Sequence, residues 1–257
     1  MIIDVCTYNG EMELFDIRYN VLSQFVDEFR VIEFDQTFSG KPKSSAFTQN
    51  WDKVKHYFVE ENPWGRYNDL ALSSPNTEYG RGAEHWTREF AQKESIRDCL
   101  ADVQDNDAVF IGDVDEIVEP AEYLSPPVGI TKFKLRVYSY YLNNRSSEQF
   151  WGPIRARWGD IKDECLNHVR KASPEKNTQE DKGWHFTSLG GYEKVKQKLT
   201  DSYTRDSYAS DMVMENLESN IRERRDFLGR AFSYRVDESE WPAYLTENKK
   251  KYEKLCL

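Results

Sequence analysis

The first part of the chain alternates between strand-like and helix-like patterns of apolar residues. The apolar run Met1–Tyr8 predicts a buried strand, and the β-branched and aromatic run Phe29–Asp35 predicts a second one. Between them, apolar side chains recur at helical spacing, which predicts a helix over residues 11–27. A strand, a helix and a strand in this order favour a βαβ unit that opens a parallel sheet.

The alternation continues toward the C-terminus. Val54–Val59, Ala108–Gly112 and Thr131–Leu142 predict further strands, whereas residues 62–82, which hold prolines and glycines, predict a long loop. Four more segments are expected to be helical: residues 84–103, 192–203, 211–229 and the charged segment 240–256. We therefore expect an α/β fold with a mostly parallel central sheet. A domain of residues 1–205 is expected to carry a C-terminal helical extension of residues 206–257 packed on it.

Composition restricts the classes of function. The net charge of −10 makes nucleic acid an unexpected partner, because phosphate binding needs a basic surface. Aromatic residues make up 14% of the chain, which fits both stacking on sugars and ordinary core packing. The four cysteines are scattered singly, so neither a zinc cluster nor a disulfide framework is expected. No run approaches ~18 apolar residues and the N-terminus lacks a signal-peptide pattern, so we expect no transmembrane segment and a cytoplasmic location.

An acidic motif directly follows the strand predicted at Ala108–Gly112. Asp113 and Asp115 lie two residues apart, so on an extended chain their side chains point the same way. At the carboxyl end of a parallel strand they would face the crevice where open α/β sheets bind ligands. Carboxylate oxygens suit Mn²⁺ or Mg²⁺, which can bridge the phosphates of a nucleoside diphosphate. The bare pattern is equally compatible with a capped acidic turn.

Two further observations bear on this motif. A second copy, Asp105-Asn106-Asp107, precedes the strand and predicts a solvated turn at the opposite edge of the sheet. An enzymatic alternative is a haloacid dehalogenase-like phosphotransferase that uses Asp113 as its nucleophile, although that motif usually lies on the first strand of its domain. A non-enzymatic alternative is a carbohydrate-binding protein in which aromatic side chains recognise a glycan.

Five segments in order resemble glycosyltransferase family 17, the group that contains the β-1,4-mannosyl-glycoprotein N-acetylglucosaminyltransferases. They are Asp4–Leu14 with Ile17 and Arg18, Ser39–Lys43, Trp86 with Arg88 and Glu89, Asp113–Ile117, and Gly183–Phe186 with Leu189–Gly191. The resemblance covers about residues 2–205 and does not extend to residues 206–257. Asn9-Gly10-Glu11 and Lys93 depart from the pattern expected of the family.

The resemblance implies a GT-A-type, Rossmann-like nucleotide-sugar-binding domain and inversion at the anomeric carbon. The expected activity is a metal-dependent transfer of a sugar, such as N-acetylglucosamine from UDP, to a glycan or other hydroxyl acceptor. Asp113, Asp115 and the late histidine His185 would then hold Mn²⁺ or Mg²⁺. For His185, a packed histidine with a satisfied hydrogen bond is the alternative.

The resemblance also suggests where the donor would bind. The expected contacts are Thr7, Tyr8, Asn9 and Glu11 after the first strand, Glu33 and Asp35 on the second, and Arg88, Asp113 and Glu116 near the motif. Inversion needs a base that deprotonates the acceptor hydroxyl. The candidates are Asp163, Glu164 and Glu193.

Several other residues are weaker candidates for contacts with a diphosphate or a sugar. Basic side chains that could approach a diphosphate are Lys41, Lys43, Arg155 and Arg157, and tryptophans that could stack on sugars are Trp151, Trp158 and Trp184. Solvation of the charged residues and core packing of the tryptophans are the alternatives.

Overall fold

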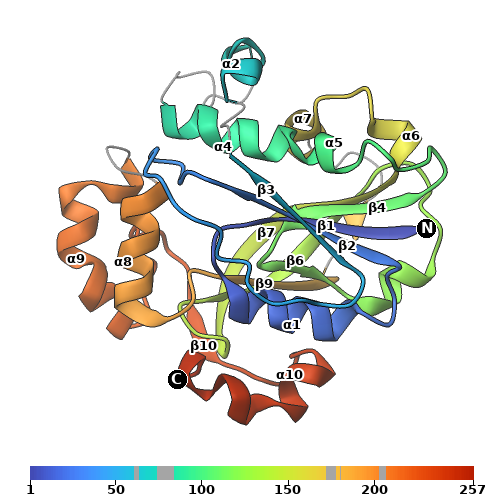
Figure 1. Cartoon of the computed structure of the whole chain (residues 1–257). Coiled ribbons are helices and arrows are strands. Elements are labelled where there is room, and N and C mark those ends of the chain that lie inside the picture. The colour runs from blue at the N-terminus through green and yellow to red at the C-terminus, as the bar shows by residue number, and fades with distance from the viewer. Residues whose placement is uncertain (61–63, 74–83, 172–177, 180, 203–206) are drawn as a thin grey trace.

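The computed structural model describes residues 1–60, 64–73, 84–171, 178–179, 181–202 and 207–257. A central sheet runs through this part of the chain in the order β3-β2-β1-β4-β7-β6-β9-β5 (Figure 1). Its first half is parallel and consists of β3 (Val54–Val59), β2 (Glu28–Phe34), β1 (Ile2–Tyr8) and β4 (Ala108–Asp113). The predicted α/β class with a mostly parallel central sheet is thereby confirmed.

The second half of the sheet is organised around one long antiparallel strand. β7 (Asn144–Arg157) runs antiparallel to both β4 and β6 (Thr131–Ser139). β9 (Gly183–Thr187) then lies parallel to β6, and β5 (Glu116–Val118) pairs antiparallel with β9. Two short strands complete the sheet: β8 (Thr178–Gln179) beside β6, and β10 (Tyr234–Val236) beside β7.

Helices cover both faces of the sheet (Figure 1). One face carries α4 (Glu84–Glu94), α5 (Ile96–Cys99), α6 (Trp158–Ile161) and α7 (Leu166–Lys171). The other carries α1 (Met12–Leu22), with α10 (Ala243–Glu247) and the 3₁₀ helix η3 (Lys249–Leu255) beneath it. α8 (Gly191–Ser202) and α9 (Asp211–Arg222) pack against each other at one side of the molecule.

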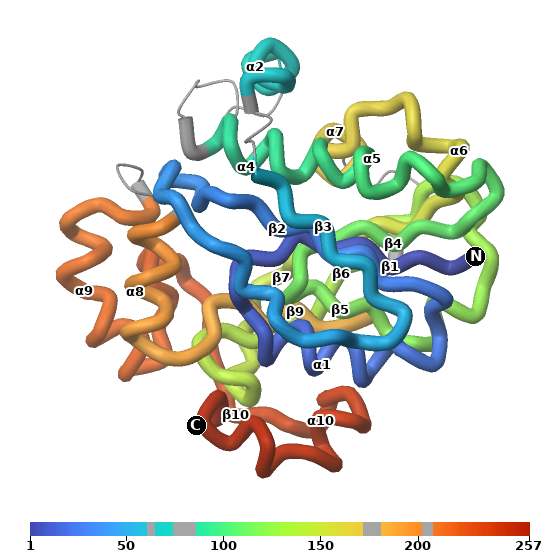
Figure 2. The backbone as a smooth tube through the Cα atoms, in the orientation of Figure 1, coloured from blue at the N-terminus to red at the C-terminus, as the bar shows by residue number. Residues whose placement is uncertain are grey.

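β1 shows why the sheet needs two covering layers. Its side chains alternate between the two faces, so that Ile3 and Val5 join the apolar core under α5, whereas Cys6 and Tyr8 join the core above α1. All four are at most 3% exposed. This strand, shown in blue in Figure 2, therefore runs through the middle of the molecule and is packed on both faces.

Several elements differ from the predicted ones. The described part of the expected loop 62–82 contains a helix, α2 (Trp64–Leu72), which packs against α4. The helix expected at 84–103 is divided into α4 and α5, and the helix expected at 211–229 ends at Arg222. Ser95 adopts helical angles between α4 and α5, and its hydroxyl donates to the carbonyl of Ala91.

Residues 207–257 add to the same sheet and cores as the rest of the chain. β10 pairs with β7, and Trp241, Leu245 and Tyr252 lie in the core that also contains α1. The division at residues 205 and 206 stays a prediction. Among the described residues, none of the helices is both long and apolar enough to cross a bilayer.

Candidate active site

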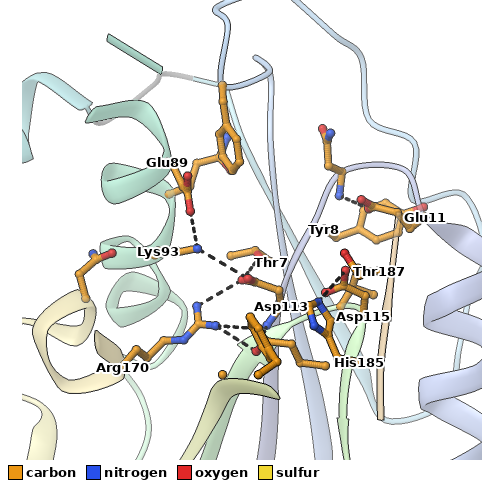
Figure 3. A pocket seen from close by; sticks show the side chains of 18 of the residues that line it. Thr7, Tyr8, Glu11, Glu89, Lys93, Asp113, Asp115, Arg170, His185 and Thr187 are labelled. Carbon is orange, nitrogen blue, oxygen red and sulfur yellow. Dashed lines mark hydrogen bonds and ion pairs between the residues drawn. The ribbon is translucent and has the colours of Figure 1, made fainter. Parts of the chain in front are cut away.

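A cavity of about 370 Å³ opens at the carboxyl ends of β1 and β4. Because these strands are parallel neighbours, Thr7 at the end of β1 lies opposite Asp113 at the end of β4. α4 and α7 supply one wall of the cavity (Figure 3), and residues of β7, β9 and α8 complete its lining. This is the edge at which the acidic motif was expected to face a ligand.

Asp113 is fixed by its neighbours at the centre of the cavity (Figure 3). Its Oδ1 accepts hydrogen bonds from the Thr7 hydroxyl at 2.8 Å and from Arg170 at 3.2 Å, and its Oδ2 lies 3.6 Å from the Lys93 ammonium. Burial alone would raise the pKa of Asp113, but the charges of Arg170 and Lys93 and these hydrogen bonds hold it well below its ordinary value. Asp113 is therefore an anion that organises the cations around it.

Asp115 faces the opposite side of the cavity, toward β9 and α8. Its Oδ2 lies 3.4 Å from His185 Nε2 and 3.8 Å from the Lys198 ammonium. Burial opposes ionisation of this carboxyl, but the charge of His185 outweighs it and lowers the pKa of Asp115. Burial likewise tends to lower the pKa of His185, and the adjacent carboxylate raises it above the ordinary value.

Glu116 closes the motif beneath Asp113. It is 1% exposed, and its Oε2 accepts from the backbone N–H of Asp113 at 2.9 Å and from Arg170 at 3.0 Å. Two glycines make room for this carboxylate, since a Cβ would lie 2.8 Å from Oε2 at Gly112 and 2.6 Å from Oε1 at Gly152. Glu116 thus joins the acidic turn to Arg170 of α7.

A buried ion pair supports the motif from below. Arg18 of α1 and Asp4 of β1 are at most 1% exposed and meet at 2.6 Å. Arg18 also donates to the carbonyl oxygens of Asp113 at 3.0 Å and Glu116 at 2.6 Å. The first βαβ unit therefore holds both ends of the acidic turn.

The sequence profile of glycosyltransferase family 17 matches residues 1–200. The chain belongs to glycosyltransferase family 17. No curated protein and no solved structure matches it at a significant level. Membership supports a glycosyltransferase activity, and it does not favour the phosphotransferase and binding-protein alternatives.

The structure divides the predicted donor contacts of this family 17 chain into two groups. Thr7, Tyr8, Asn9 and Glu11 line the cavity, as do Asp113 and Glu116 of the motif. Glu33, Asp35 and Arg88 do not line it.

Glu33 and Arg88 have other partners. Glu33 is buried on β2 and accepts from Lys43 at 3.0 Å and from the N–H of Ala46 at 2.9 Å. Arg88 donates to the carbonyl of Phe38 at 3.2 Å and packs on Gly40, where a Cβ would lie 2.9 Å from its guanidinium carbon. Both residues hold the loop after β2.

The three candidate bases lie outside the cavity. Asp163 and Glu164 are exposed and follow α6, and Glu193 is exposed on the first turn of α8. Asp163 and Glu164 were candidates because they follow a strand that was expected on the acceptor side. β7 instead runs antiparallel to β4, so its last residue, Arg157, pairs with Ala108 at the start of β4.

Most of the weaker candidates also lie elsewhere. Lys41 pairs with Asp201 at 2.7 Å, Arg155 donates to the carbonyl of Glu122 at 2.6 Å, and Arg157 is exposed. Of the three tryptophans only Trp151 lines the cavity, because Trp158 and Trp184 are buried in the cores.

The upstream acidic copy is only partly a solvated turn. Asp105 has 65% of its side chain exposed, as expected. Asp107 is only 7% exposed and accepts from the backbone N–H of Gln104 at 2.9 Å.

The cavity contains cations that sequence reasoning missed. Lys93, Arg170, Lys171 and Lys198 line it together with Asn167 and Phe150. They come from α4, α7, α8 and β7, which lie far apart in the sequence. A basic residue on a short helix has no local signal that distinguishes it from a solvated one, so only the fold reveals this group. The net charge of −10 therefore coexists with a cluster of positive charge at the site.

The residues at Asp115 fit a divalent cation in their chemistry. A carboxylate and an imidazole approach each other here, and His185 Nδ1 is buried without a hydrogen-bond partner among the described residues. Asp113 is already bound to Thr7 and Arg170. In the described part of the chain, no group of three or more His, Cys, Asp or Glu side chains is arranged to hold a metal. A cation at Asp115 would need further oxygen ligands from a substrate or from water.

Proposed function

We propose that this family 17 member is an inverting, metal-dependent glycosyltransferase with a GT-A-type fold. It would transfer a sugar such as N-acetylglucosamine from a UDP-sugar to a hydroxyl group of a glycan or similar acceptor. The observation that carries the proposal is the contact of Asp115 with His185 at the carboxyl edge of the sheet, beside a cluster of basic residues. Acidic and imidazole ligands next to cations suit a metal–diphosphate ligand.

In this proposal the nucleoside lies against the end of β1. The Tyr8 ring packs edge-on against Phe47 at 5.4 Å, and its buried hydroxyl has no hydrogen-bond partner among the described residues. An unpaired buried hydroxyl is costly, so a polar group of the base or ribose would stabilise it. Asn9 lines the same wall and can contribute its amide.

The diphosphate would lie between the two sides of the cavity. Asp115 and His185 would hold Mn²⁺ or Mg²⁺, which neutralises charge on the departing diphosphate. Lys198, whose ammonium lies 3.8 Å from Asp115, can contact the same phosphates. Asp113 keeps a fixed position among the basic residues, because hydrogen bonds from Thr7 and Arg170 hold it in place. Preorganised charges of this kind stabilise a leaving group without a cost of reorganisation.

The test compares two aspartates by calorimetric titration of UDP in the presence and absence of Mn²⁺. Asp115→Asn is expected to weaken Mn²⁺-dependent UDP binding by at least about 10-fold, since loss of even an outer partner of a metal costs that much. Release of UDP from a UDP-sugar should fall with it. The matched control is Asp105→Asn in the exposed upstream copy, which should bind UDP like the wild type. Equal Mn²⁺-dependent affinity in Asp115→Asn and the wild type would exclude this assignment.

A further inference from the structure

A second cavity of about 300 Å³ adjoins the first. Asn9, Glu11 and Lys198 line both cavities, so these three residues form the boundary between them. Figure 3 shows Glu11 on the side of Asp115 and Thr187, away from Lys93 and Arg170. The second cavity therefore meets the first beside the carboxylate assigned to the metal and diphosphate.

The walls of the second cavity suit a neutral, polyhydroxylated ligand. Its volume lies at the lower end of the roughly 300–1,000 Å³ typical of small-molecule pockets. Lys194 and Lys198 balance Glu11 and Glu13, while Asp201 is already paired with Lys41 at 2.7 Å. With the polar side chains of Asn9, Ser188 and Gln197, such a lining offers both donors and acceptors, which the binding of sugar hydroxyls requires.

One wall of this cavity is a backbone turn in an uncommon conformation. Ser188, Gly190 and Gly191 have φ values of 54°, 98° and 69°, all in the left-handed region. The carbonyl oxygen of Tyr140 accepts from the N–H groups of Gly190 at 3.0 Å and Gly191 at 3.3 Å. Left-handed backbone at a non-glycine residue is costly and collects at ligand sites, so the turn is a preformed wall.

Glu11 is positioned at the boundary by the loop after β1. Its Oε2 accepts from the backbone N–H of Asn9 at 2.8 Å, which fixes the carboxylate between the two cavities. We propose that the second cavity binds the acceptor as a neutral saccharide, and that Glu11 is the catalytic base. This inference rests on the proposed function, because it assumes a nucleotide-sugar donor in the first cavity.

The chemistry of this arrangement balances. The acceptor hydroxyl oxygen forms a bond to the anomeric carbon of the donor sugar, and the bond from that carbon to the diphosphate oxygen breaks. The electron pair of the broken bond leaves with the diphosphate, and the hydroxyl proton passes to the Glu11 carboxylate. Inversion then requires the donor sugar to lie between Glu11 and the diphosphate, so that the acceptor hydroxyl attacks the face opposite the leaving group.

The binding part of the proposal is tested with methyl glycosides of mannose, galactose and N-acetylglucosamine as probes. Saturation-transfer NMR should detect at least one of them on the wild-type protein. Gln197→Trp, an exposed position on α8 that lines the second cavity, should abolish that signal while UDP–Mn²⁺ affinity stays within about 2-fold. The control is Lys196→Trp, the neighbouring exposed residue that lines neither cavity, which should leave both readouts unchanged.

The catalytic part is tested with Glu11→Gln, whose amide oxygen can still accept from Asn9. This variant should still bind UDP–Mn²⁺ and the glycosides, yet transfer sugar about 10²–10⁴-fold more slowly when both are saturating, the usual contribution of a general base. Wild-type transfer in Glu11→Gln, no glycoside signal on the wild type, or an undiminished signal in Gln197→Trp would overturn the inference. Failure of the donor assignment shows separately, as absent UDP–Mn²⁺ binding with glycoside binding intact.

Discussion

Single side chains in this site are held by close packing around the acidic motif, and Gly152 shows how little space remains. A Cβ at this position would lie 2.6 Å from Glu116 Oε1 and 2.3 Å from an edge carbon of Phe150. Glu116 cannot simply swing away, because Arg170 and the backbone N–H of Asp113 bind its other oxygen. The absence of a side chain at residue 152 is therefore a requirement of the motif.

Gly152→Ala should destabilise the protein by about 1–3 kcal/mol, the usual cost of overpacking a filled interior. It should also weaken UDP–Mn²⁺ binding, because displacement of Glu116 disturbs the turn that carries Asp115. Chemical denaturation and calorimetry measure the two effects. The matched control is Gly65→Ala in α2, where a Cβ would meet nothing within 4 Å; it should be neutral or stabilise by up to about 1 kcal/mol. Equal stabilities of the two variants would contradict this view.

Glu33 illustrates a buried carboxylate whose ionisation contributes to stability. Burial opposes its charge, but hydrogen bonds from His56, the Ala46 N–H and Lys43 outweigh burial and lower its pKa from 4.5 to about 2. Because the folded-state pKa lies below the unfolded-state value, the folded protein binds the Glu33 proton less readily. The contribution is complete above about pH 4.5 and is lost as the pH falls toward about 2.

Glu33→Gln should therefore lower the free energy of unfolding by up to about 3 kcal/mol at neutral pH, since each pKa unit corresponds to about 1.4 kcal/mol. The difference from the wild type should shrink as the pH falls below about 4.5. Urea denaturation of both proteins at several pH values measures it. A difference that stays constant down to about pH 3 would show that charge at Glu33 is not the cause.

At the scale of elements, the first strand and first helix act as one unit beneath the site. Arg18 of α1 neutralises Asp4 of β1 and donates to the carbonyl oxygens of Asp113 and Glu116. Tyr123 donates its hydroxyl to the second oxygen of Asp4 at 2.6 Å. The pair thus joins α1, β1 and the acidic turn in the buried interior of the protein.

Arg18→Met should destabilise the protein by about 3–5 kcal/mol, because it leaves the Asp4 carboxylate buried without its partner. The double variant Asp4→Leu with Arg18→Met should recover part of this loss, since no uncompensated charge remains. UDP–Mn²⁺ binding should stay impaired in both, because the carbonyl oxygens of the acidic turn lose their donor. Denaturation midpoints and calorimetry on the same samples separate the two effects. If the double variant binds UDP–Mn²⁺ like the wild type, Arg18 has no role beyond balancing charge.

A strand can be predicted from the sequence where its residues form a mostly apolar run. The runs Met1–Tyr8 and Ala108–Gly112 are mostly apolar, and they form the buried strands β1 and β4. The direction of β7 was not predictable, because it depends on pairing with β4 and β6 rather than on its own sequence. Asp163 and Glu164, which follow β7 and α6, consequently lie outside the cavity. α2 was missed because its buried residues, Tyr67 and Ala71, are too few to show a pattern.

For the whole molecule, the site combines features that local sequence shows with features that only the fold brings together. Thr7 and Asp113 were predicted from their place after apolar strands, and parallel pairing makes them neighbours. Arg170 and Lys198 reach the same cavity through α7 and α8, which follow β7 and β9 in the sequence. Their contribution depends on long-range closure of the sheet, so no spacing rule in the sequence reveals it.

The C-terminal segment also packs on elements that lie far from it in the sequence, so we expect the stability of the fold to depend on this packing. Trp241, Leu245 and Tyr252 are at most 7% exposed and belong to the core that contains α1. The Trp241 ring N–H donates to the carbonyl of Leu142 at 2.8 Å, and the Tyr252 hydroxyl donates to Asp16 of α1. This segment, shown in red in Figure 2, covers the face of α1 that is turned away from the sheet.

Deletion of residues 238–257 should consequently unfold the protein or leave it insoluble. Burial of each of the three large side chains contributes about 1.5–3 kcal/mol, and their sum approaches the roughly 5–15 kcal/mol that stabilises a typical domain. Circular dichroism and thermal denaturation measure the result, with Lys250→Ala, at an exposed position in the same segment, as the unaffected control. A truncated chain that melts cooperatively at the wild-type temperature would instead make residues 238–257 a dispensable appendage. The core above α1 would then have to be complete without Trp241, Leu245 and Tyr252.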